Sequence, residues 1–356
     1  MQDSKIRGPI LMREYIQKIK AKKNLTKDEI ASVMHSIMSG EADYDEISDF
    51  LLALRQKGPT VDEITGAAEI MRKFVISIDS RQKDILDTCG TGGDRKNSFN
   101  ISTVSALVAA GAGAVVAKHG NRSVSSKCGS ADVLEALGVR LDIEERYLGE
   151  CLDSVGIAFL FAQRLHPAMK NVAPVRKRLG VETIFNILGP LTNPAGATHQ
   201  IMGVYSCDLV EPLAMVLKNL GIKRAVVVHG SDGLDEITVT GRSFISEYTG
   251  EDIVSYDISP EEFGMEISPP SALEGGDIEE NARIVNEILD GVPGPKRDIV
   301  LINAAYALYA AGKVDSITIG LEMARDSIDT GKARNKLEQL KEFTHRISKV
   351  DVRHCE

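Results

Sequence analysis

Apolar positions in the first 75 or so residues recur at intervals of three and four, the spacing of one face of a helix. Three of these runs begin at a Thr or Asp that is followed three residues later by Glu, the pattern of a capping box. The pairs are Thr26 and Glu29, Asp43 and Glu46, and Thr60 and Glu63. With an earlier run over residues 10–19, the pattern predicts four short amphipathic helices, most simply a packing or dimerisation unit.

The pattern changes near Lys83, where short apolar runs begin to alternate with helical stretches. This alternation is typical of an α/β domain with a largely parallel sheet. Residues 237–258 alternate and are rich in Thr, Tyr and Val, which predicts that part of the sheet is antiparallel, and residues 281–343 return to helical spacing. The predicted buried strands are residues 84–87, 114–117, 158–161, 201–205 and 225–228.

One segment, residues 176–194, interrupts this alternation with a basic run followed by apolar and polar residues that end in Pro194. We interpret it as a crossing back to the helical unit. We therefore expect a helical domain over residues 1–77, with 177–197 returning to it, and an α/β domain over 78–176 and 198–356 with a mixed, mostly parallel sheet. A length of 356 residues fits two domains at about 150 residues each.

The overall charge, the hydropathy and the cysteine pattern argue against several classes of protein. A formal net charge of −9 argues against broad nucleic-acid binding, which needs an excess of Lys and Arg. No apolar run approaches the roughly 20 residues of a membrane span, and the first residues are too charged for a signal peptide. The cysteines form no Cys-x-x-Cys pair, so reduced thiols in the cytoplasm are expected rather than disulfides or zinc. They are Cys89, Cys128, Cys151, Cys207 and Cys355.

The strongest local signal is the glycine-rich loop of residues 87–94, which reads Asp-Thr-Cys-Gly-Thr-Gly-Gly-Asp. It follows a predicted strand and precedes a predicted helix, so its glycines can bring backbone N–H groups against an anion near a helix N-terminus. It matches neither the Walker A loop nor the dinucleotide-binding loop. The alternative is a tight turn that binds no ligand.

Two further polar stretches also lie where strands or helices end. Residues 100–103, Asn-Ile-Ser-Thr, sit at the predicted start of a helix, and capping accounts for one of their side chains at most. Residues 118–132 hold three cations, several hydroxyls and two glycines after the strand ending at Ala117. We favour a phosphate-binding loop over a solvated surface loop, because ligands bind at the carboxyl ends of strands in open α/β sheets.

Acidic and basic side chains complete the candidate chemistry. Asp232, Asp235 and Glu236 follow another predicted strand. Neighbouring carboxylates repel each other unless a cation lies between them, so a magnesium ion bridging to a diphosphate is one reading and an acidic turn in water is the other. Arg176 lies on a helix that Pro167 opens, and its planar guanidinium suits a carboxylate, although a solvated basic helix end explains it equally well.

Taken together, these motifs resemble the anthranilate phosphoribosyltransferase family of tryptophan biosynthesis. The resemblance extends over nearly the whole chain, with the motifs in the family's order. They are residues 90–94, 100–103, 118–122, 129–138, 166–168 and 186–194 and the pair Asp235 and Glu236. It implies a small helical domain that forms homodimers and a larger α/β domain with a mixed sheet.

The resemblance also implies a role for individual residues. Metal binding falls to Ser102, Asp235 and Glu236, with two Mg²⁺ ions expected. Anthranilate binding falls to Gly90, His119, Asn121 and Arg176, of which Arg176 contacts the carboxylate. His119 is only a candidate proton acceptor, and no catalytic residue is assigned beyond it. Phosphoribosyl pyrophosphate binding falls to Gly90, Thr91, Gly92, Gly93, Asp94, Asn100, Ser102, Thr103, Lys118 and Ser130.

The implied reaction moves the phosphoribosyl group of phosphoribosyl pyrophosphate to the amine of anthranilate, the second step of tryptophan biosynthesis from chorismate. Two positions depart from the family pattern: Cys128 stands where a serine is expected, and Ser123 where an alanine is expected. Two alternatives share the fold, a pyrimidine nucleoside phosphorylase and a paralogue that binds nucleic acid. The net charge and Arg176 count against the second alternative.

Overall fold

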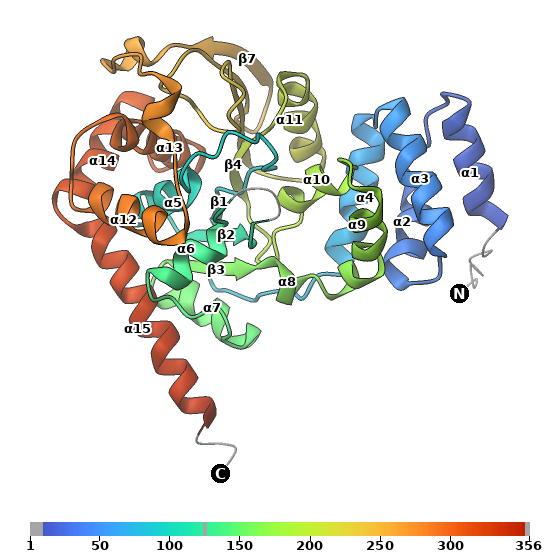
Figure 1. The fold of residues 1–356 in the computed structure, drawn as a ribbon, viewed down its shortest axis with the longest axis horizontal. Coiled ribbons are helices and arrows are strands. Elements are labelled where there is room, and N and C mark those ends of the chain that lie inside the picture. The colour runs from blue at the N-terminus through green and yellow to red at the C-terminus, as the bar shows by residue number, and fades with distance from the viewer. Residues whose placement is uncertain (1–9, 124–126, 353–356) are drawn as a thin grey trace. The chain divides into compact units, whose positions relative to one another are not determined.

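The structure is a computed structural model that describes residues 10–123 and 127–352. The chain divides into two compact units, one of residues 1–76 with 166–192 and the other of residues 77–165 with 193–356 (Figure 1). The returning segment therefore spans 166–192, whereas the sequence pattern placed it at 177–197. Cys355 and the stretch before Ile10 lie outside the described residues.

The helical unit begins with the four predicted helices. Thr26 and Thr60 each form a full capping box with the Glu three residues later, as predicted. Asp43 caps its helix through the amides of Asp45 and Glu46, but no reciprocal contact forms, because the Glu46 carboxylate pairs with Arg13 at 3.0 Å. The helices are α1 (Ile10–Lys20), α2 (Lys27–Ser39), α3 (Tyr44–Lys57) and α4 (Val61–Lys73).

The returning segment packs on these helices through side-chain contacts. Asn171 Nδ2 donates to the Met38 carbonyl at 2.8 Å, and Arg72 Nε donates to the Leu191 carbonyl at 2.8 Å. Its elements are η1 (Pro167–Asn171), α9 (Ala173–Leu179), α10 (Phe185–Leu188) and η2 (Gly189–Leu191).

The prediction of one helix running from Pro167 to Arg176 is wrong. Pro167 opens the 3-10 helix η1, and Arg176 lies on the separate helix α9, which has Pro174 in its first turn. Proline lacks an N–H and clashes with the preceding turn, so the first helix ends before it.

The second unit is built on one seven-stranded sheet of order β3-β2-β1-β4-β5-β6-β7. The first five strands along the chain pair in parallel, and β6 and β7 add an antiparallel hairpin, which confirms the predicted mixed sheet. The strands are β1 (Leu86–Asp87), β2 (Val116–Gly120), β3 (Ile157–Phe161), β4 (His199–Gly203), β5 (Arg224–Gly230), β6 (Ser243–Tyr248) and β7 (Ile253–Ile258).

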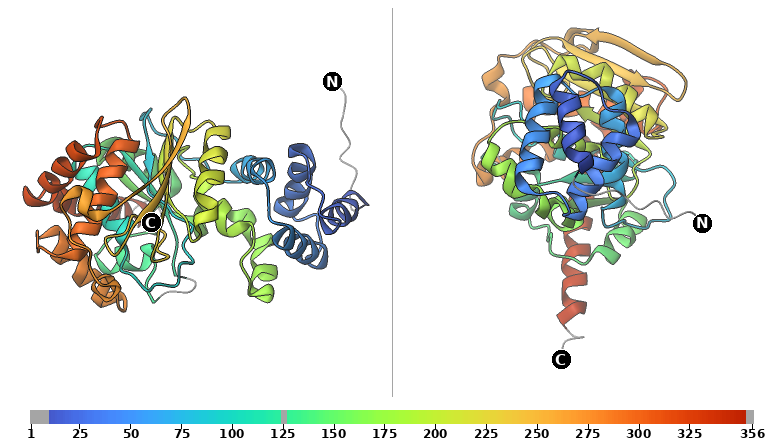
Figure 2. Two further views of the ribbon diagram at one scale, coloured as in Figure 1. Left: turned by 90° about the horizontal axis from the view of Figure 1, so that it is seen from above. Right: turned by 90° about the vertical axis from the view of Figure 1, so that its right-hand side faces the viewer.

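Helices cover both faces of this sheet (Figure 2). Helix α11 packs against β5 and β6, while α5 and α13 pack against each other and against β2 and β4, respectively. None of the described helices is long and apolar enough to cross a membrane. The helices are α5 (Ile101–Gly111), α6 (Ser130–Ala136), α7 (Glu145–Ser154), α8 (Ala162–Leu165), α11 (Val210–Asn219), α12 (Ile278–Leu289), α13 (Pro295–Ala310), α14 (Ile317–Asp329) and α15 (Lys332–Val352), with short 3-10 turns η3 (Cys207–Leu209), η4 (Pro260–Phe263) and η5 (Pro270–Leu273).

Candidate active site

The predicted site residues of the second unit gather at the carboxyl ends of its parallel strands. Asp87 ends β1, Lys118 and His119 lie at the end of β2, and Gly203 ends β4. The acidic segment of residues 232–236 follows β5. Parallel strands place their carboxyl ends at one edge of the sheet, which is why segments more than 100 residues apart in the chain meet here.

The glycine-rich loop and the acidic pair contact each other directly. The Gly92 amide donates to Asp235 Oδ2 at 2.8 Å, although 143 residues separate them. The Thr91 amide donates to the Gly203 carbonyl at 2.8 Å, which ties the loop to the end of β4. Two motifs that were identified separately in the sequence are therefore adjacent in the structure.

Glycine is required at two positions of this contact for different reasons. Gly92 has a φ of 62°, in the left-handed region that residues with a Cβ adopt only at a cost. Gly90 is not in the left-handed region, but a Cβ there would lie 2.9 Å from Asp235 Oδ2 and 3.0 Å from the Gly203 carbonyl oxygen. The loop thus needs glycine both for its turn and for its close approach to the acidic pair.

Three carboxylates, Asp94, Asp235 and Glu236, cluster beside this loop. Burial, and then the charge of Asp94, raise the pKa of Asp235 to about 7. Burial, and then the charge of Asp235, raise the pKa of Glu236 well above its usual range. Asp94 Oδ2 is buried and accepts no hydrogen bond from the described residues. Half-buried carboxylates that repel one another fit a divalent cation, and oxygen ligands are the kind that magnesium prefers.

Lys118 supplies the local positive charge. Its side chain is 4% exposed, and its ammonium donates to the Thr88 carbonyl and hydroxyl, both at 3.3 Å, and to Ser102 Oγ at 3.2 Å. The same charge lowers the pKa of Glu236, although burial and Asp235 outweigh it. The Ser102 backbone amide also lowers the pKa of Glu236, so this residue links the cation to the acidic pair.

The polar residues at the start of helix α5 do not cap the helix in the usual way. Asn100 occupies the N-cap position but makes no side-chain capping bond; instead its Nδ2 donates to the Cys128 carbonyl at 3.3 Å. Asn100 Oδ1 and Thr103 Oγ1 are buried and have no hydrogen-bond partner among the described residues. Buried polar atoms of this kind indicate a ligand or water, so the capping interpretation does not account for either residue.

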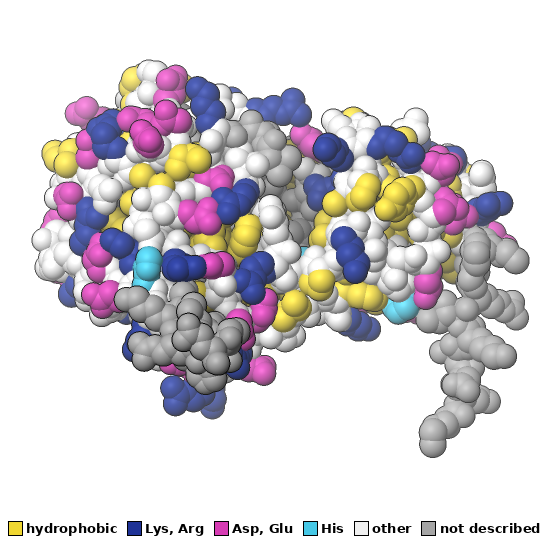
Figure 3. Space-filling view, turned by 60° about the horizontal axis from the view of Figure 1, so that its bottom comes forward, with side chains coloured by type: hydrophobic (Ala, Val, Ile, Leu, Met, Phe, Trp, Pro, Cys, Tyr) yellow, Lys and Arg dark blue, Asp and Glu magenta, His cyan; other side chains and the backbone are white. Residues whose placement is uncertain are grey.

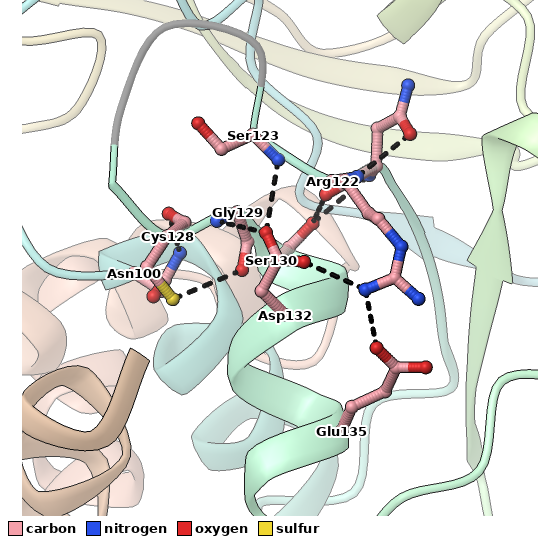
Figure 4. A network of polar contacts seen from close by, with 9 residues as sticks. Asn100, Arg122, Ser123, Cys128, Gly129, Ser130, Asp132 and Glu135 are labelled. Atoms are coloured by element: carbon pink, nitrogen blue, oxygen red, sulfur yellow. Dashed lines mark hydrogen bonds and ion pairs between the residues drawn. The ribbon is translucent and has the colours of Figure 1, made fainter. Parts of the chain in front are cut away.

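The predicted phosphate loop folds around one carboxylate (Figure 4). Asp132 Oδ2 accepts the amides of Gly129 at 2.9 Å and Ser123 at 3.2 Å, and Oδ1 accepts from Arg122 Nη1 at 2.8 Å. Ser130 Oγ accepts the Asn121 amide at 3.2 Å. The described ends of the loop are thus held together by Asp132, a residue to which the sequence analysis gave no role, and residues 124–126 lie outside the description.

Cys128 is accommodated in this loop without reactive chemistry. Its thiol is 6% exposed and contacts the Gly129 carbonyl at 3.6 Å. Burial, and then the charge of Asp132, raise the pKa of the Cys128 thiol to about 11, so the thiol stays protonated at neutral pH. The contact to Asn100 uses the backbone carbonyl, which a serine at this position would also provide.

The position of His119 depends on a buried contact that the sequence analysis did not anticipate. Asp87 Oδ1 accepts the His119 amide at 3.1 Å, and Asp87 Oδ2 accepts from Asn193 Nδ2 at 2.7 Å. Asn193 Nδ2 also donates to the Ala117 carbonyl at 2.8 Å. Burial raises the pKa of Asp87 to about 6. Asn193 belongs to a predicted motif, but no local pattern pairs it with a residue 106 positions earlier.

Asp87, Cys89 and His119 also bring metal-binding atom types within 4.8 Å of one another. Burial, and then the charge of Asp87, strongly raise the pKa of the Cys89 thiol, which keeps it protonated. Both Asp87 oxygens already accept hydrogen bonds. We therefore assign this cluster to the positioning of β2 rather than to a metal.

Arg176 lies in the other unit, on α9. Its guanidinium lies 5.8 Å from the centre of the Phe185 ring, and its Nη2 donates to Asn186 Oδ1 at 3.3 Å. Burial lowers its pKa from the usual value, and no carboxylate of the described residues pairs with it. A half-buried guanidinium held by an aromatic ring and an amide suits a planar anion. That it shares a site with His119 stays a prediction.

Comparison with known proteins shows which family the chain matches. Residues 82–334 match the glycosyl transferase family, a/b domain, and residues 13–75 match the helical bundle domain of the same family. The anthranilate phosphoribosyltransferase of Symbiobacterium thermophilum is 51% identical over 336 residues, which cover 94% of this chain and 98% of that protein. That of Desulforamulus reducens is 51% identical over 337 residues, which cover 95% and 98%.

Solved structures agree with the sequence matches. The crystal structure of anthranilate phosphoribosyltransferase from Thermus thermophilus has a TM-score of 0.88 at 42% identity and covers 93% of this chain and 99% of its own. The enzyme from Saccharomyces cerevisiae, solved in complex with phosphoribosyl pyrophosphate and Mg, has a TM-score of 0.88 at 28% identity, with 95% and 99% covered. The chain described here therefore belongs to the anthranilate phosphoribosyltransferase family.

Proposed function

We infer that this protein transfers the phosphoribosyl group of phosphoribosyl pyrophosphate to the amine of anthranilate in a magnesium-dependent reaction of tryptophan biosynthesis. The observation that carries the proposal is the contact between the Gly92 amide and Asp235 Oδ2, which brings an anion-binding loop and a metal-binding pair to one place. Relatives at about 50% identity carry the name of this enzyme, and they do not favour the phosphorylase or nucleic-acid-binding alternatives.

The reaction forms a bond from the anthranilate nitrogen to the anomeric carbon and breaks the bond from that carbon to pyrophosphate. Backbone amides of residues 90–94 and the Lys118 ammonium bind the leaving diphosphate, whose growing negative charge is the main electrostatic demand. Asp235, Glu236 and the Ser102 hydroxyl would hold magnesium, which would stabilise the charge of the leaving group. We propose two ions.

We propose that Gly90, His119, Asn121 and Arg176 bind the acceptor, anthranilate. The aromatic amine is neutral and carries its own lone pair, so orientation contributes more than prior deprotonation. Arg176 binds the carboxylate, and His119 is a candidate for taking the proton that the amine loses after attack. Asn100, Thr103 and Ser130 complete the phosphate contacts, and the unpartnered Asn100 and Thr103 oxygens support this assignment.

The direct test is a fluorescence assay. Mixing the protein with anthranilate, phosphoribosyl pyrophosphate and Mg²⁺ should consume anthranilate and extinguish its fluorescence, and omitting any one component should abolish the change. Parallel incubation with pyrimidine nucleosides and inorganic phosphate tests phosphorolysis. Nucleoside cleavage without anthranilate consumption would overturn the proposal.

Magnesium binding should strengthen as the pH rises from 6 to 8. The Asp235 carboxyl has a raised pKa of about 7, so it is largely neutral at pH 6 and ionised at pH 8, and only the ionised form binds the metal. Displacing one proton predicts about a 10-fold increase in apparent affinity over this interval. The titration uses Mn²⁺ and the protein alone, because the substrate phosphates titrate in the same range. An affinity that does not vary with pH would contradict the assignment.

Replacing Arg176 by alanine should raise the KM for anthranilate about 10- to 100-fold, the loss expected for hydrogen bonds to a charged group. The KM for phosphoribosyl pyrophosphate should change little, because Arg176 is assigned to the acceptor. Arg176→Lys keeps the charge but lacks the planar guanidinium, so its KM for anthranilate should lie between those of the wild type and Arg176→Ala. Steady-state kinetics with each substrate varied in turn decide the point, and an unchanged anthranilate KM argues against the role.

We further propose a cytoplasmic homodimer that assembles through the helical unit and binds neither nucleic acid nor membranes. The support for the dimer is the exposed apolar surface of α3, where Tyr44 is 50% and Leu52 is 43% exposed. Acidic and basic side chains are interspersed on the face shown in Figure 3, and the net charge is −9, which supports the absence of a nucleic-acid partner. Light scattering after size exclusion, with Leu52→Lys as the variant, tests the assembly.

A further inference from the structure

Helix α13 carries one polar side chain where its neighbours are apolar. Between Ile299 and Leu308 every residue is buried, and Asn303 among them is 2% exposed. A buried amide costs free energy unless each of its polar groups finds a partner. Its presence in the middle of this helix therefore calls for a specific contact.

That contact is a two-point clamp on the peptide groups of Ile237. Asn303 Oδ1 accepts the Ile237 amide at 3.0 Å, and Asn303 Nδ2 donates to the Ile237 carbonyl at 2.8 Å. The same Nδ2 donates to the Ile299 carbonyl one helical turn back at 2.8 Å, which fixes the orientation of the amide on α13. The donors and the acceptor of the side chain are thus engaged, three bonds in all.

Ile237 directly follows Glu236, so the clamp acts on the backbone that carries the acidic pair. The segment is also held from its other side by Asp232. Asp232 Oδ1 accepts the Leu234 amide at 3.1 Å, and Oδ2 accepts the Thr238 hydroxyl at 2.7 Å and also the Thr240 hydroxyl. Both Asp232 oxygens therefore accept hydrogen bonds within the loop, and we do not assign Asp232 as a metal ligand beside Asp235 and Glu236.

We propose that Asn303 is a positioning residue for the magnesium site: its clamp on Ile237 holds the backbone of Asp235 and Glu236 in the geometry that binds the metal. Asp235 and Glu236 are adjacent in the chain, and because like charges repel, their carboxylates would move apart if their backbone were free to do so. A rigid anchor from a buried helix opposes that separation before the metal arrives. The proposal rests on the assignment of Asp235 and Glu236 as metal ligands.

Asn303→Ser and Asn303→Leu test the proposal, the first by shortening the side chain and the second by removing its polar groups at similar volume. Both should raise the Mg²⁺ concentration that gives half-maximal activity about 10-fold or more, the range seen when a partner that orients metal ligands is lost. Mn²⁺ titration of the protein by electron paramagnetic resonance gives the same comparison without turnover. The KM for anthranilate at saturating Mg²⁺ should stay near the wild-type value.

Ser327→Ala is the matched control. Ser327 is fully buried on α14 and donates to the Val108 carbonyl at 2.8 Å, so this variant also loses a buried hydrogen bond, away from the acidic pair. It should lower the unfolding temperature and leave the Mg²⁺ and Mn²⁺ dependence unchanged. Thermal unfolding of every variant confirms that the titrations report folded protein, and Asn303→Asp is the replacement if either of the first two does not fold.

Two failures can be told apart with Glu236→Gln measured alongside. If Glu236→Gln weakens metal binding and the folded Asn303 variants bind Mg²⁺ and Mn²⁺ like the wild type, the positioning role is wrong and the metal site stands. If Glu236→Gln leaves metal binding unchanged, the metal assignment is wrong and the role of Asn303 falls with it. A metal-binding defect in Asn303 variants that is matched by Ser327→Ala would also overturn the proposal, because general destabilisation would then explain it.

Discussion

Glu236→Gln is expected to lower kcat/KM for phosphoribosyl pyrophosphate by about 10²- to 10³-fold at limiting Mg²⁺, the scale of losing one group that stabilises a developing charge. Glutamine keeps the shape of the side chain and one oxygen but removes the negative charge that binds the metal. Part of the activity should return as Mg²⁺ is raised, because Asp235 and the diphosphate still bind the ion.

The same variant should unfold at a higher temperature than the wild type when EDTA is present. The pKa of Glu236 is raised by burial and then by Asp235, so ionising this carboxyl costs more in the folded, metal-free protein than in the unfolded chain. For a carboxyl with a raised folded-state pKa, stability is lost as the pH rises through that pKa, and glutamine removes this loss. A loss of activity together with a gain in stability is typical of groups held in place for function.

Glu251→Gln provides the control for the charge change alone. Glu251 is exposed in the same unit, so its replacement changes the net charge equally and should leave both the activity and the unfolding temperature near wild type. Steady-state kinetics over a Mg²⁺ series and scanning calorimetry in EDTA provide the two measurements. Full activity of Glu236→Gln at limiting Mg²⁺ would remove Glu236 from the metal site.

Gly203→Ala is expected to disrupt both halves of the diphosphate site. A Cβ at Gly203 would lie 1.5 Å from the Asp235 carbonyl oxygen and 2.5 Å from its carbon, and both are backbone atoms that cannot rotate away. Either the end of β4 or the acidic segment must move. The Gly203 carbonyl also accepts the Thr91 amide, so the movement reaches the glycine-rich loop as well.

Overpacking of this kind typically costs about 1–3 kcal/mol and more where backbone must shift, so we expect at least about 3 kcal/mol. For a unit of this size that corresponds to a fall of about 6–12 °C in Tm. Activity should fall to the background of the assay even where the protein remains folded, because Thr91 and Asp235 are displaced together. Calorimetry and the anthranilate fluorescence assay measure the two effects.

Gly189→Ala is the matched methyl addition. An added Cβ at Gly189 has no heavy atom within 4 Å, and the residue has right-handed helical backbone angles that alanine favours. It should change stability by less than about 0.5 kcal/mol. A Gly203→Ala protein with wild-type stability and activity would mean that the close approach of β4 to the acidic segment is not required.

Local patterns were sufficient for much of the fold. Thr26 and Thr60 cap the helices at which the sequence placed them, because a capping box involves residues only three apart. The alternation of strands and helices after Lys83 likewise predicted a largely parallel sheet, since strands buried on both faces leave continuous apolar runs. The motifs that resemble the family were local in the same sense, and they named the function without any knowledge of geometry.

Local patterns were misleading where a residue's partner lies elsewhere in the chain. The N-cap position of Asn100 suggested capping, but its side chain contacts the carbonyl of Cys128, 28 residues later. Pro174 divided a helix that was predicted to begin at Pro167 and to include Arg176. In each case the local sequence pattern predicted one structure, and a steric clash or a tertiary contact produced another.

What the sequence by itself determined is the set of elements and the fold class, and it also named the residues proposed to carry the chemistry, because each depends on side chains a few positions apart. Only the tertiary structure decided which carboxylate oxygens accept hydrogen bonds within their own loop and which are left to bind a ligand. Asp232 and Asp235 look alike in sequence, yet one closes its own loop and the other meets Gly92 from 143 residues away. Asn303 and Gly203 lie against backbone atoms in and next to the acidic segment. No local pattern in the sequence predicts these contacts. Their importance follows from packing in three dimensions, where a single hydrogen bond or a single methyl group sets the position of the site.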